Sequence, residues 1–310
     1  MPMCGIVGYI GQAGDSRDYF ALDVVLEGLR RLEYRGYDSA GVAVHANGEI
    51  SYRKKAGKVA ALDAEIARAP LADSLLAIGH TRWATHGGPS DANAHPHVVD
   101  GGKLAVVHNG IIENFAELRA ELSAKGYNFV SATDTEVAAT LLEDIYNTEA
   151  KGDLTLAMQL TGQRLEGAFT LLAIHADHDD RIVAARRNSP LVIGLGEGEN
   201  FLGSDVSGFI DYTRKAVEMG NDQIVNDYQI TNFDGSEATG KPFDVEWDAA
   251  AAEKGGFDSF MDKEIHDQPA AVRDTLMGRL GEDGKLVLDE LRIDEATLRS
   301  VDKIIVVACG

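Results

Sequence analysis

The chain has 310 residues, 45% of them hydrophobic, and its 29 basic and 50 acidic residues give a formal net charge of −21. This acidity argues against a nucleic-acid partner, since no excess of cations can displace the counterions of a phosphate backbone, and no apolar run approaches the roughly 20 residues that span a bilayer. There is no signal-peptide pattern, and the two cysteines, Cys4 and Cys309, form no disulfide framework, so we expect a cytoplasmic protein without a membrane partner.

The first hundred residues predict strands and helices in turn. Cys4–Ile10 has the composition of a buried apolar strand, and apolar residues recur at helical spacing from Tyr19 to Leu32. A hairpin follows, because two strand-like segments flank Asn47-Gly48, the dipeptide that best fits a tight hairpin turn.

The next hundred residues continue the mixture. Leu104–Val107 predicts a strand that leads directly into His108-Asn109-Gly110, and residues 133–136 have the capping-box form at the head of a helical run, Val137–Tyr146. Further strands are expected at residues 169–174, 181–185, 191–193 and 223–225. Hairpins with helices between them predict an α+β fold in which antiparallel sheets are covered by helices.

The composition changes near residues 245–258. We expect a first domain over residues 4–245, a connector over residues 246–302 with a helix at Phe257–Leu280, and a new apolar strand at Lys303–Ala308 that opens a further domain over residues 303–310. A chain seldom finishes on a fresh core strand, so we expect this one to be the first part of a longer protein.

Cys4 is the first candidate for chemistry. A thiol attacks only as the thiolate, and a free cysteine keeps its proton up to a pH of about 8.5. If Cys4 were the first residue, its own α-amino group, with a pKa of about 7.7–8.0, could take that proton. The alternative is a small apolar residue that begins a strand.

For several polar residues elsewhere, both a functional role and a purely structural role are open. Arg82 could pair with a substrate carboxylate or form an internal salt bridge. Asn109 and Gly110 could supply the two donors of an oxyanion hole or belong to an ordinary Asn-Gly turn. Asp134 could bind a substrate ammonium group or simply favour the helix dipole.

Several histidines lie close together in the sequence, and a metal site has to be considered. His95-Pro96-His97 gives alternating directions on an extended segment, and no set of convergent ligands is evident around His80, His86 or His108. We therefore expect no metal and no cofactor.

The motifs occur in an order that resembles one family, the glutaminase domain of the glutamine–fructose-6-phosphate aminotransferases (isomerizing), or glucosamine-6-phosphate synthases. These are class II amidotransferases of the N-terminal-nucleophile hydrolase type. The resemblance covers nearly the whole chain and rests on Cys4-Gly5-Ile6-Val7-Gly8, on Leu-Glu-Tyr-Arg-Gly-Tyr-Asp-Ser at residues 32–39, on His-Thr-Arg-Trp-Ala-Thr-His-Gly at 80–87, on His-Asn-Gly at 108–110 and on Thr-Asp-Thr-Glu at 133–136.

The resemblance implies a four-layer αββα fold with two stacked antiparallel sheets. It also implies that Cys4 attacks the side-chain amide of glutamine, that ammonia leaves, and that water hydrolyses the thioester to glutamate. Asn109 and Gly110 are then expected to hold the oxyanion in both tetrahedral steps.

The same resemblance assigns the binding of glutamine and the passage of ammonia. Arg82 is expected to hold the α-carboxylate and Asp134 the α-ammonium group. The expected remainder of the site consists of Thr85, His86 and Gly110 in the pocket and Trp83 as a gate for ammonia. Fructose 6-phosphate is expected to bind only in C-terminal domains that this chain lacks, and a homodimer is possible in the longer form.

The start of the chain departs from the family pattern, because Met1-Pro2-Met3 precedes Cys4. We expect Met1-Pro2 to be an added pair or an upstream start, and excision of Met3 to expose the Cys4 amine. If residues 1–3 stay in place, the chain could be a silent glutamine-binding domain. A second alternative is another class II amidotransferase, such as an amidophosphoribosyltransferase.

Overall fold

A computed structural model describes residues 4–12, 19–34, 36–84, 86–226, 229–245, 257, 260–276, 295–303 and 305. The chain divides into two units. The first comprises residues 2–249, and the second comprises residues 250–310 together with Met1. The described part of the second unit contains the helices α6 (Phe260–Leu276) and α7 (Glu295–Arg299), and α6 lies within the range Phe257–Leu280 for which a helix is expected. The strand expected at Lys303–Ala308 lies mostly outside the described residues. No helix among the described residues is long and apolar enough to span a bilayer.

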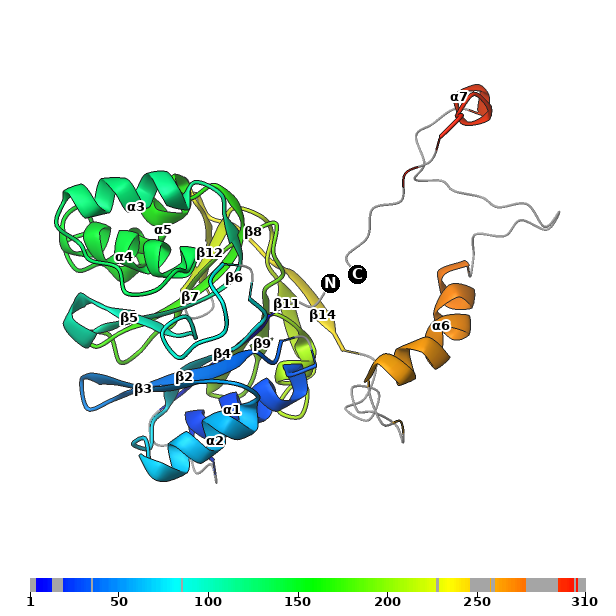
Figure 1. The fold of residues 1–310 in the computed structure, drawn as a ribbon. Coiled ribbons are helices and arrows are strands. Elements are labelled where there is room, and N and C mark those ends of the chain that lie inside the picture. The colour runs from blue at the N-terminus through cyan, green and yellow to red at the C-terminus, as the bar shows by residue number, and fades with distance from the viewer. Residues whose placement is uncertain are drawn as a thin grey trace. The chain divides into compact units, whose positions relative to one another are not determined.

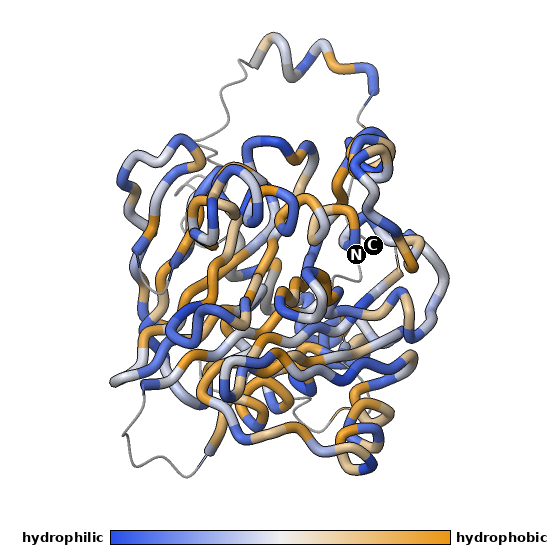
Figure 2. The backbone as a smooth tube through the Cα atoms, turned by 90° about the vertical axis from the view of Figure 1, so that its left-hand side faces the viewer, coloured by the Kyte–Doolittle hydropathy of each residue, from blue (hydrophilic) through white to orange (hydrophobic). Residues whose placement is uncertain are grey.

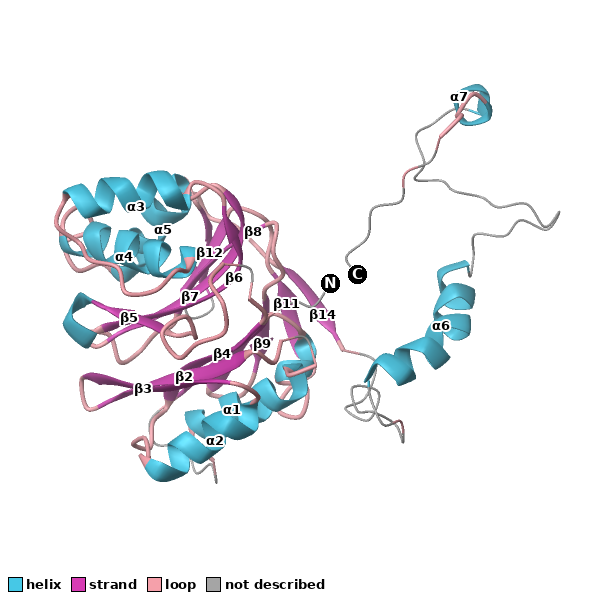
Figure 3. Cartoon of the chain, viewed as in Figure 1, coloured by secondary structure: helices cyan, strands magenta, loops and turns pink. Residues whose placement is uncertain are grey.

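The first unit is built on two antiparallel sheets that are stacked face to face (Figures 1 and 3). The larger sheet has the strand order β14-β11-β9-β10-β1-β4-β2-β3, and the smaller has the order β13-β12-β8-β7-β6-β5. The strands are β1 (Gly5–Gly11), β2 (Ser39–Ala46), β3 (Glu49–Ala56), β4 (Leu76–Arg82), β5 (His97–Val99), β6 (Leu104–Ile112), β7 (Gly167–His175), β8 (Val183–Arg187), β9 (Val192–Leu195), β10 (Glu199–Gly203), β11 (Lys215–Glu218), β12 (Gln223–Asn226), β13 (Gln229–Asn232) and β14 (Lys241–Asp244).

Helices cover the outer face of each sheet (Figure 1). The larger sheet carries α1 (Ala21–Leu32) and α2 (Val59–Arg68), and the smaller carries α3 (Phe115–Ala124), α4 (Asp134–Asn147) and α5 (Leu154–Arg164). Two short 3₁₀ turns, η1 (Asp100–Gly102) and η2 (Val206–Gly208), complete the unit. The expected four-layer αββα arrangement is thereby confirmed.

The central strands are hydrophobic at nearly every position because both of their faces are buried. In β1, Ile6 faces the core between the sheets, whereas Val7 and Tyr9 face the core under α1 and α2. This is the period of two that successive strand residues follow. Figure 2 shows the hydrophobic segments, in orange, along the strands of both sheets.

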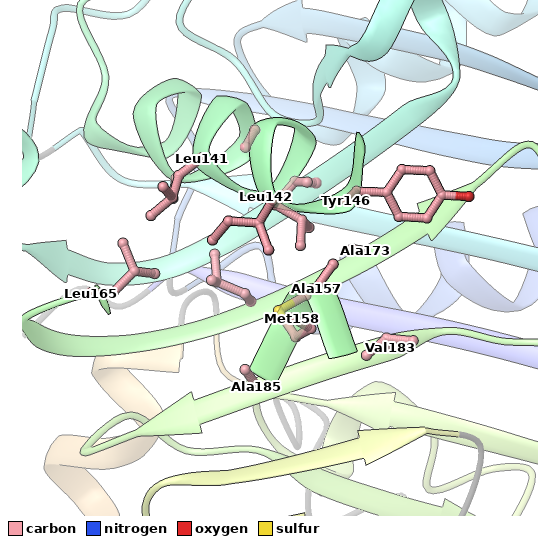
Figure 4. Packing of buried hydrophobic residues seen from close by; sticks show 14 of the residues in the cluster. Leu141, Leu142, Tyr146, Ala157, Met158, Leu165, Ala173, Val183 and Ala185 are labelled. Atoms are coloured by element: carbon pink, nitrogen blue, oxygen red, sulfur yellow. The ribbon is translucent and has the colours of Figure 1, made fainter. Parts of the chain in front are cut away.

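The third core lies between the smaller sheet and its helices (Figure 4). Leu141 and Leu142 of α4 and Met158 of α5 pack there against Ala173 of β7 and Val183 of β8. Because α3 and α5 flank α4, almost every side chain of α4 is buried. This burial fixes the N-terminus of α4 firmly against the sheet.

Three predictions about local structure need correction. The strand expected to end at Val107 continues to Ile112, because β7 offers a hydrogen-bonding partner along the whole of β6. The Asn-Gly turn is therefore wrong, and Asn109 and Gly110 lie within a strand. The capping box is half formed: Thr133 caps Glu136, but the Glu136 carboxylate accepts from the N–H groups of Val130 and Ser131 instead.

Several elements were not predicted at all. They are four helices and five short strands: α2, α3, α5, α7, β5, β10, β11, β13 and β14. These strands have only three to five residues each, too few for a clear hydrophobic alternation, and their pairing with neighbouring strands defines them.

Candidate active site

Cys4 lies immediately before β1, next to the C-terminal end of β4. Its Sγ accepts a hydrogen bond from the Trp83 backbone N–H at 3.2 Å and lies 3.5 Å from the Trp83 carbonyl oxygen. Burial raises the pKa of the Cys4 thiol to about 11, against a smaller lowering by the Trp83 N–H. With residues 1–3 attached, Cys4 is therefore a thiol near neutral pH, and it needs a base to become a nucleophile.

Asn109 and Gly110 come from β6 of the other sheet. The Asn109 Nδ2 donates to the Cys4 carbonyl oxygen at 2.9 Å, which joins the two sheets beside the sulfur. Gly110 has a φ of +116°, and a Cβ at this position would lie 2.0 Å from the Ala168 carbonyl oxygen. Glycine is required here, since it alone avoids both the strained φ and the collision.

Asp134 is the first residue of α4 and is almost fully buried. Its Oδ2 accepts from the Ile112 N–H at 2.9 Å, and its Oδ1 lies 3.9 Å from Nδ1 of His86. Thr133 caps the helix, so the helix start sets the direction of the carboxylate. The interpretation that concerns the helix dipole is met, because Asp134 sits at a helix N-terminus, and its Oδ1 is the carboxylate oxygen that faces His86.

Arg82 ends β4 with its side chain buried. One terminal nitrogen, Nη2, donates to the carbonyl oxygens of His86 at 2.5 Å and Gly87 at 2.9 Å. The other, Nη1, lies 3.7 Å from Oδ1 of Asp38 and has no hydrogen-bond partner among the described residues. The internal salt bridge considered for Arg82 is therefore long, and one buried donor is left for a ligand.

Trp83 follows Arg82 and packs edge-on against Tyr37, with ring centroids 5.2 Å apart. His86 packs against Phe115 in the same manner at 5.0 Å. Thr85, the remaining predicted pocket residue, lies outside the described residues.

A narrow cavity of about 10 Å³ brings most of the predicted residues together, although Asn109 is not among those that line it. Its lining comprises Cys4, Arg82, Trp83, His86, His95, His108, Gly110, Thr133, Asp134 and Thr135. A larger hollow lies at the other end of β1 and contains none of the predicted site residues. The small cavity presents a thiol, one cationic group and one anionic group. The two charged groups match the carboxylate and the ammonium group of an amino acid, and the thiol matches a reactive side chain.

The neighbouring histidines are buried and neutral. Burial lowers the pKa of His80 to about 3 and holds the pKa values of His95, His97 and His108 below their ordinary value. Within the described ranges, no group of three or more His, Cys, Asp or Glu side chains is arranged to hold a metal ion.

Sequence reasoning missed what His80 does. Its Nε2 lies 3.0 Å from Oδ1 of Asn109, behind the amide that faces Cys4. The available signal was a histidine that directly follows the apolar part of β4 and precedes Thr81 and Arg82.

Known proteins resemble this chain in sequence and in fold. The model of a glutamine amidotransferase domain matches residues 80–211. A glutamine–fructose-6-phosphate aminotransferase (isomerizing) of Corynebacterium glutamicum is 89% identical over 99% of this chain and 50% of its own length, and that of Streptomyces coelicolor is 59% identical over 99% and 49%. The chain thus spans about half the length of the curated relatives it matches.

Solved structures support the fold. The glutamine phosphoribosylpyrophosphate amidotransferase from B. subtilis, complexed with ADP and GMP, aligns with 79% of this chain and 50% of its own, at a TM-score of 0.60 and 23% identity. A structure described as the allosteric regulatory enzyme of purine biosynthesis aligns over the same shares at 0.61 and 23%. At this identity the likeness concerns the architecture alone.

Proposed function

Because this chain belongs to the family of the glutamine–fructose-6-phosphate aminotransferases (isomerizing), as its glutamine amidotransferase domain, we propose that it hydrolyses glutamine to glutamate and ammonia with Cys4 as the nucleophile. The observation that carries the proposal is the hydrogen bond from Asn109 Nδ2 to the Cys4 carbonyl at 2.9 Å. This contact joins an amide donor of the second sheet to the backbone of Cys4, and Cys4 itself lines the cavity together with Arg82 and Asp134.

The nucleophile is activated by its own α-amine. With residues 1–3 removed, that amine takes the thiol proton as Sγ attacks the amide carbon of glutamine. The Sγ–C bond forms, the tetrahedral intermediate collapses, and the C–N bond breaks as the amine returns its proton to the leaving ammonia. The same amine then takes a proton from water as the water attacks the thioester carbon. The S–C bond breaks, the proton returns to Sγ, and glutamate leaves.

The negative oxygen of each tetrahedral step needs donors that are fixed in advance. Asn109 Nδ2 and the Gly110 backbone N–H fill this role, since both residues belong to β6 and are held by its pairing with β7. One such donor is worth about 2.7–4 kcal/mol in comparable sites.

The backbone end of glutamine carries both charges. Arg82 binds the α-carboxylate through Nη1, the donor left without a partner among the described residues. Asp134 binds the α-ammonium group, Thr85, His86 and Gly110 complete the pocket, and Trp83 acts as a gate for ammonia.

The use of the ammonia lies beyond this chain. The relatives' name implies that the full-length protein converts fructose 6-phosphate to glucosamine 6-phosphate in a second half of about the same length. Residues 4–245 would then be the glutaminase domain, residues 246–302 the connector, and residues 303–310 the start of the sugar-isomerase part. We place the protein in the cytoplasm and expect a homodimer in its full-length form.

The test compares the chain that starts at Cys4 with the chain that keeps residues 1–3. Intact mass identifies each form, and glutamate release measures turnover. We expect turnover only from the Cys4 form and none after Cys4→Ala. Turnover with residues 1–3 still attached would contradict the amine as base and make His86 the first candidate.

The pH dependence of alkylation gives an independent measurement. The thiol pKa is about 11 with residues 1–3 attached, so the rate with iodoacetamide should rise up to that pH. In the Cys4 form the amine should bring the midpoint down toward its own pKa, about 7.7–8.0. Identical profiles in the two forms would count against activation by the amine.

A further inference from the structure

The side-chain amide of Asn109 is held from both sides. Its Nδ2 lies 2.9 Å from the Cys4 carbonyl oxygen and its Oδ1 lies 3.0 Å from Nε2 of His80. A carbonyl oxygen can only accept, so the NH₂ of the amide must face Cys4 and the oxygen must face His80. It follows that Nε2 of His80 carries a hydrogen and donates it.

His80 is suited to keep this arrangement. It is fully buried in β4, where Ile6 of β1 and Gly41 of β2 are its strand neighbours, and its ring lies 4.1 Å from that of His95. Burial keeps it neutral, with a pKa of about 3, so the ring has one hydrogen to give. The second ring nitrogen, Nδ1, has no hydrogen-bond partner in the described part of the chain.

We propose that His80 is a positioning residue: its Nε2–H fixes the amide of Asn109 so that the NH₂ group, not the oxygen, points to the oxyanion that forms on glutamine. This rests on the proposed glutaminase reaction. A reversed amide would turn a lone pair toward the developing negative charge, and it would leave the Asn109 oxygen and the imidazole hydrogen without their pairing.

Two substitutions of His80 distinguish the effect of its hydrogen bond to Asn109 from the effect of side-chain packing at this position. The amide nitrogen of a glutamine at this position can occupy the place of Nε2, whereas that of an asparagine reaches only the place of Nδ1. In the glutamine-hydrolysing form of the chain, we expect His80→Asn to lower kcat about 10- to 100-fold, which is less than the loss of an oxyanion donor. The KM for glutamine should change less than threefold, and His80→Gln should recover most of the rate.

A double-mutant cycle with Asn109→Ala tests whether His80 acts through Asn109. In the Asn109→Ala background, His80→Asn should change kcat less than about threefold, because the amide it orients is gone. Alkylation of Cys4 by iodoacetamide should be unchanged in all variants, since it forms no oxyanion. A full multiplicative loss in the double variant, or equal losses in His80→Asn and His80→Gln, would overturn the proposal.

The tautomer of His80 can be measured without turnover. In the unsubstituted chain the imidazole ¹⁵N shifts should show a neutral ring with its hydrogen on Nε2 down to pH 5. A hydrogen on Nδ1 would contradict the proposal even if glutamine is hydrolysed. Absence of glutamate release with the Nε2–H tautomer in place would count against the reaction at Cys4 and leave the role of His80 in orienting the amide intact.

Discussion

Arg82 and Asp134 place opposite charges within one small cavity, and each is oriented by backbone groups. Two carbonyl oxygens hold the guanidinium and one N–H holds the carboxylate. If the two side chains bind the ends of glutamine as proposed, both are already held in place, and little side-chain entropy should be lost on binding.

Asp134→Asn tests this charge at nearly constant shape. An asparagine oxygen can still accept from Ile112, but it cannot pair with an ammonium group. A hydrogen bond to a charged group is worth about 1.5–3 kcal/mol, so the KM for glutamine should rise about 10- to 100-fold.

The matched control is Asp153→Asn. Asp153 also begins a helix, where its side chain accepts from the Leu156 N–H, but it does not line the cavity. Its KM should stay at the unsubstituted value. A similar rise in both variants, measured by steady-state glutamate release, would exclude a direct role for Asp134 in binding.

The strand β6 carries two of the proposed site residues, Asn109 and Gly110, and its positive backbone φ is confined to Gly110. The strand pairs with β7 from Leu104 to Ile112, and only the backbone of Gly110 departs from ordinary strand angles, at a φ of +116°. This departure belongs to a regular ladder, so it is maintained by the hydrogen bonds on either side. We regard it as the reason the sequence places a glycine next to Asn109.

Gly110→Ala should destabilise the protein by more than the cost of positive φ. That cost is about 1–3 kcal/mol, and the collision with the Ala168 carbonyl adds to it. Gly126→Ala is the control, since Gly126 has a φ of +100° with no atom within 4 Å of an added Cβ. Chemical denaturation should show the larger loss for Gly110→Ala, together with lost turnover. Equal losses would show that the approach to Ala168 relaxes without cost.

At the scale of the whole molecule, the site depends on the stacking of the two sheets. Cys4 directly precedes β1 of the larger sheet and Arg82 ends β4 of that sheet, whereas Asn109 and Gly110 belong to β6 of the smaller. The core between the sheets, which includes the fully buried Leu172 of β7, therefore sets the distance between Cys4 and Asn109.

Leu172→Ala should lower the free energy of unfolding by about 2–5 kcal/mol, because it leaves a cavity between the sheets. Leu156→Ala, at a position 37% exposed on α5, should stay within about 0.5 kcal/mol. Equilibrium denaturation measures both. A small loss at Leu172 would mean that the sheets close over the gap, and the glutaminase rate should then shift as the two halves of the site move.

The sequence by itself determined the kinds of residues and most of the long elements. Cys4, Arg82, Asn109, Gly110 and Asp134 are recognisable in short motifs, and β1, α1 and the β2–β3 hairpin follow from hydrophobic periodicity and the Asn-Gly turn. These are local signals, because spacing along the chain fixes which face a side chain takes.

Only the tertiary structure decided how those residues meet. Asn109 and Gly110 lie inside a strand because β7, some sixty residues later, pairs with them, and His80 stands behind Asn109 because the two sheets stack there. One terminal nitrogen of the Arg82 guanidinium donates to two backbone carbonyl oxygens of the segment that follows β4. Such contacts depend on partners that are distant in sequence, and no pattern within β4 or β6 specifies them.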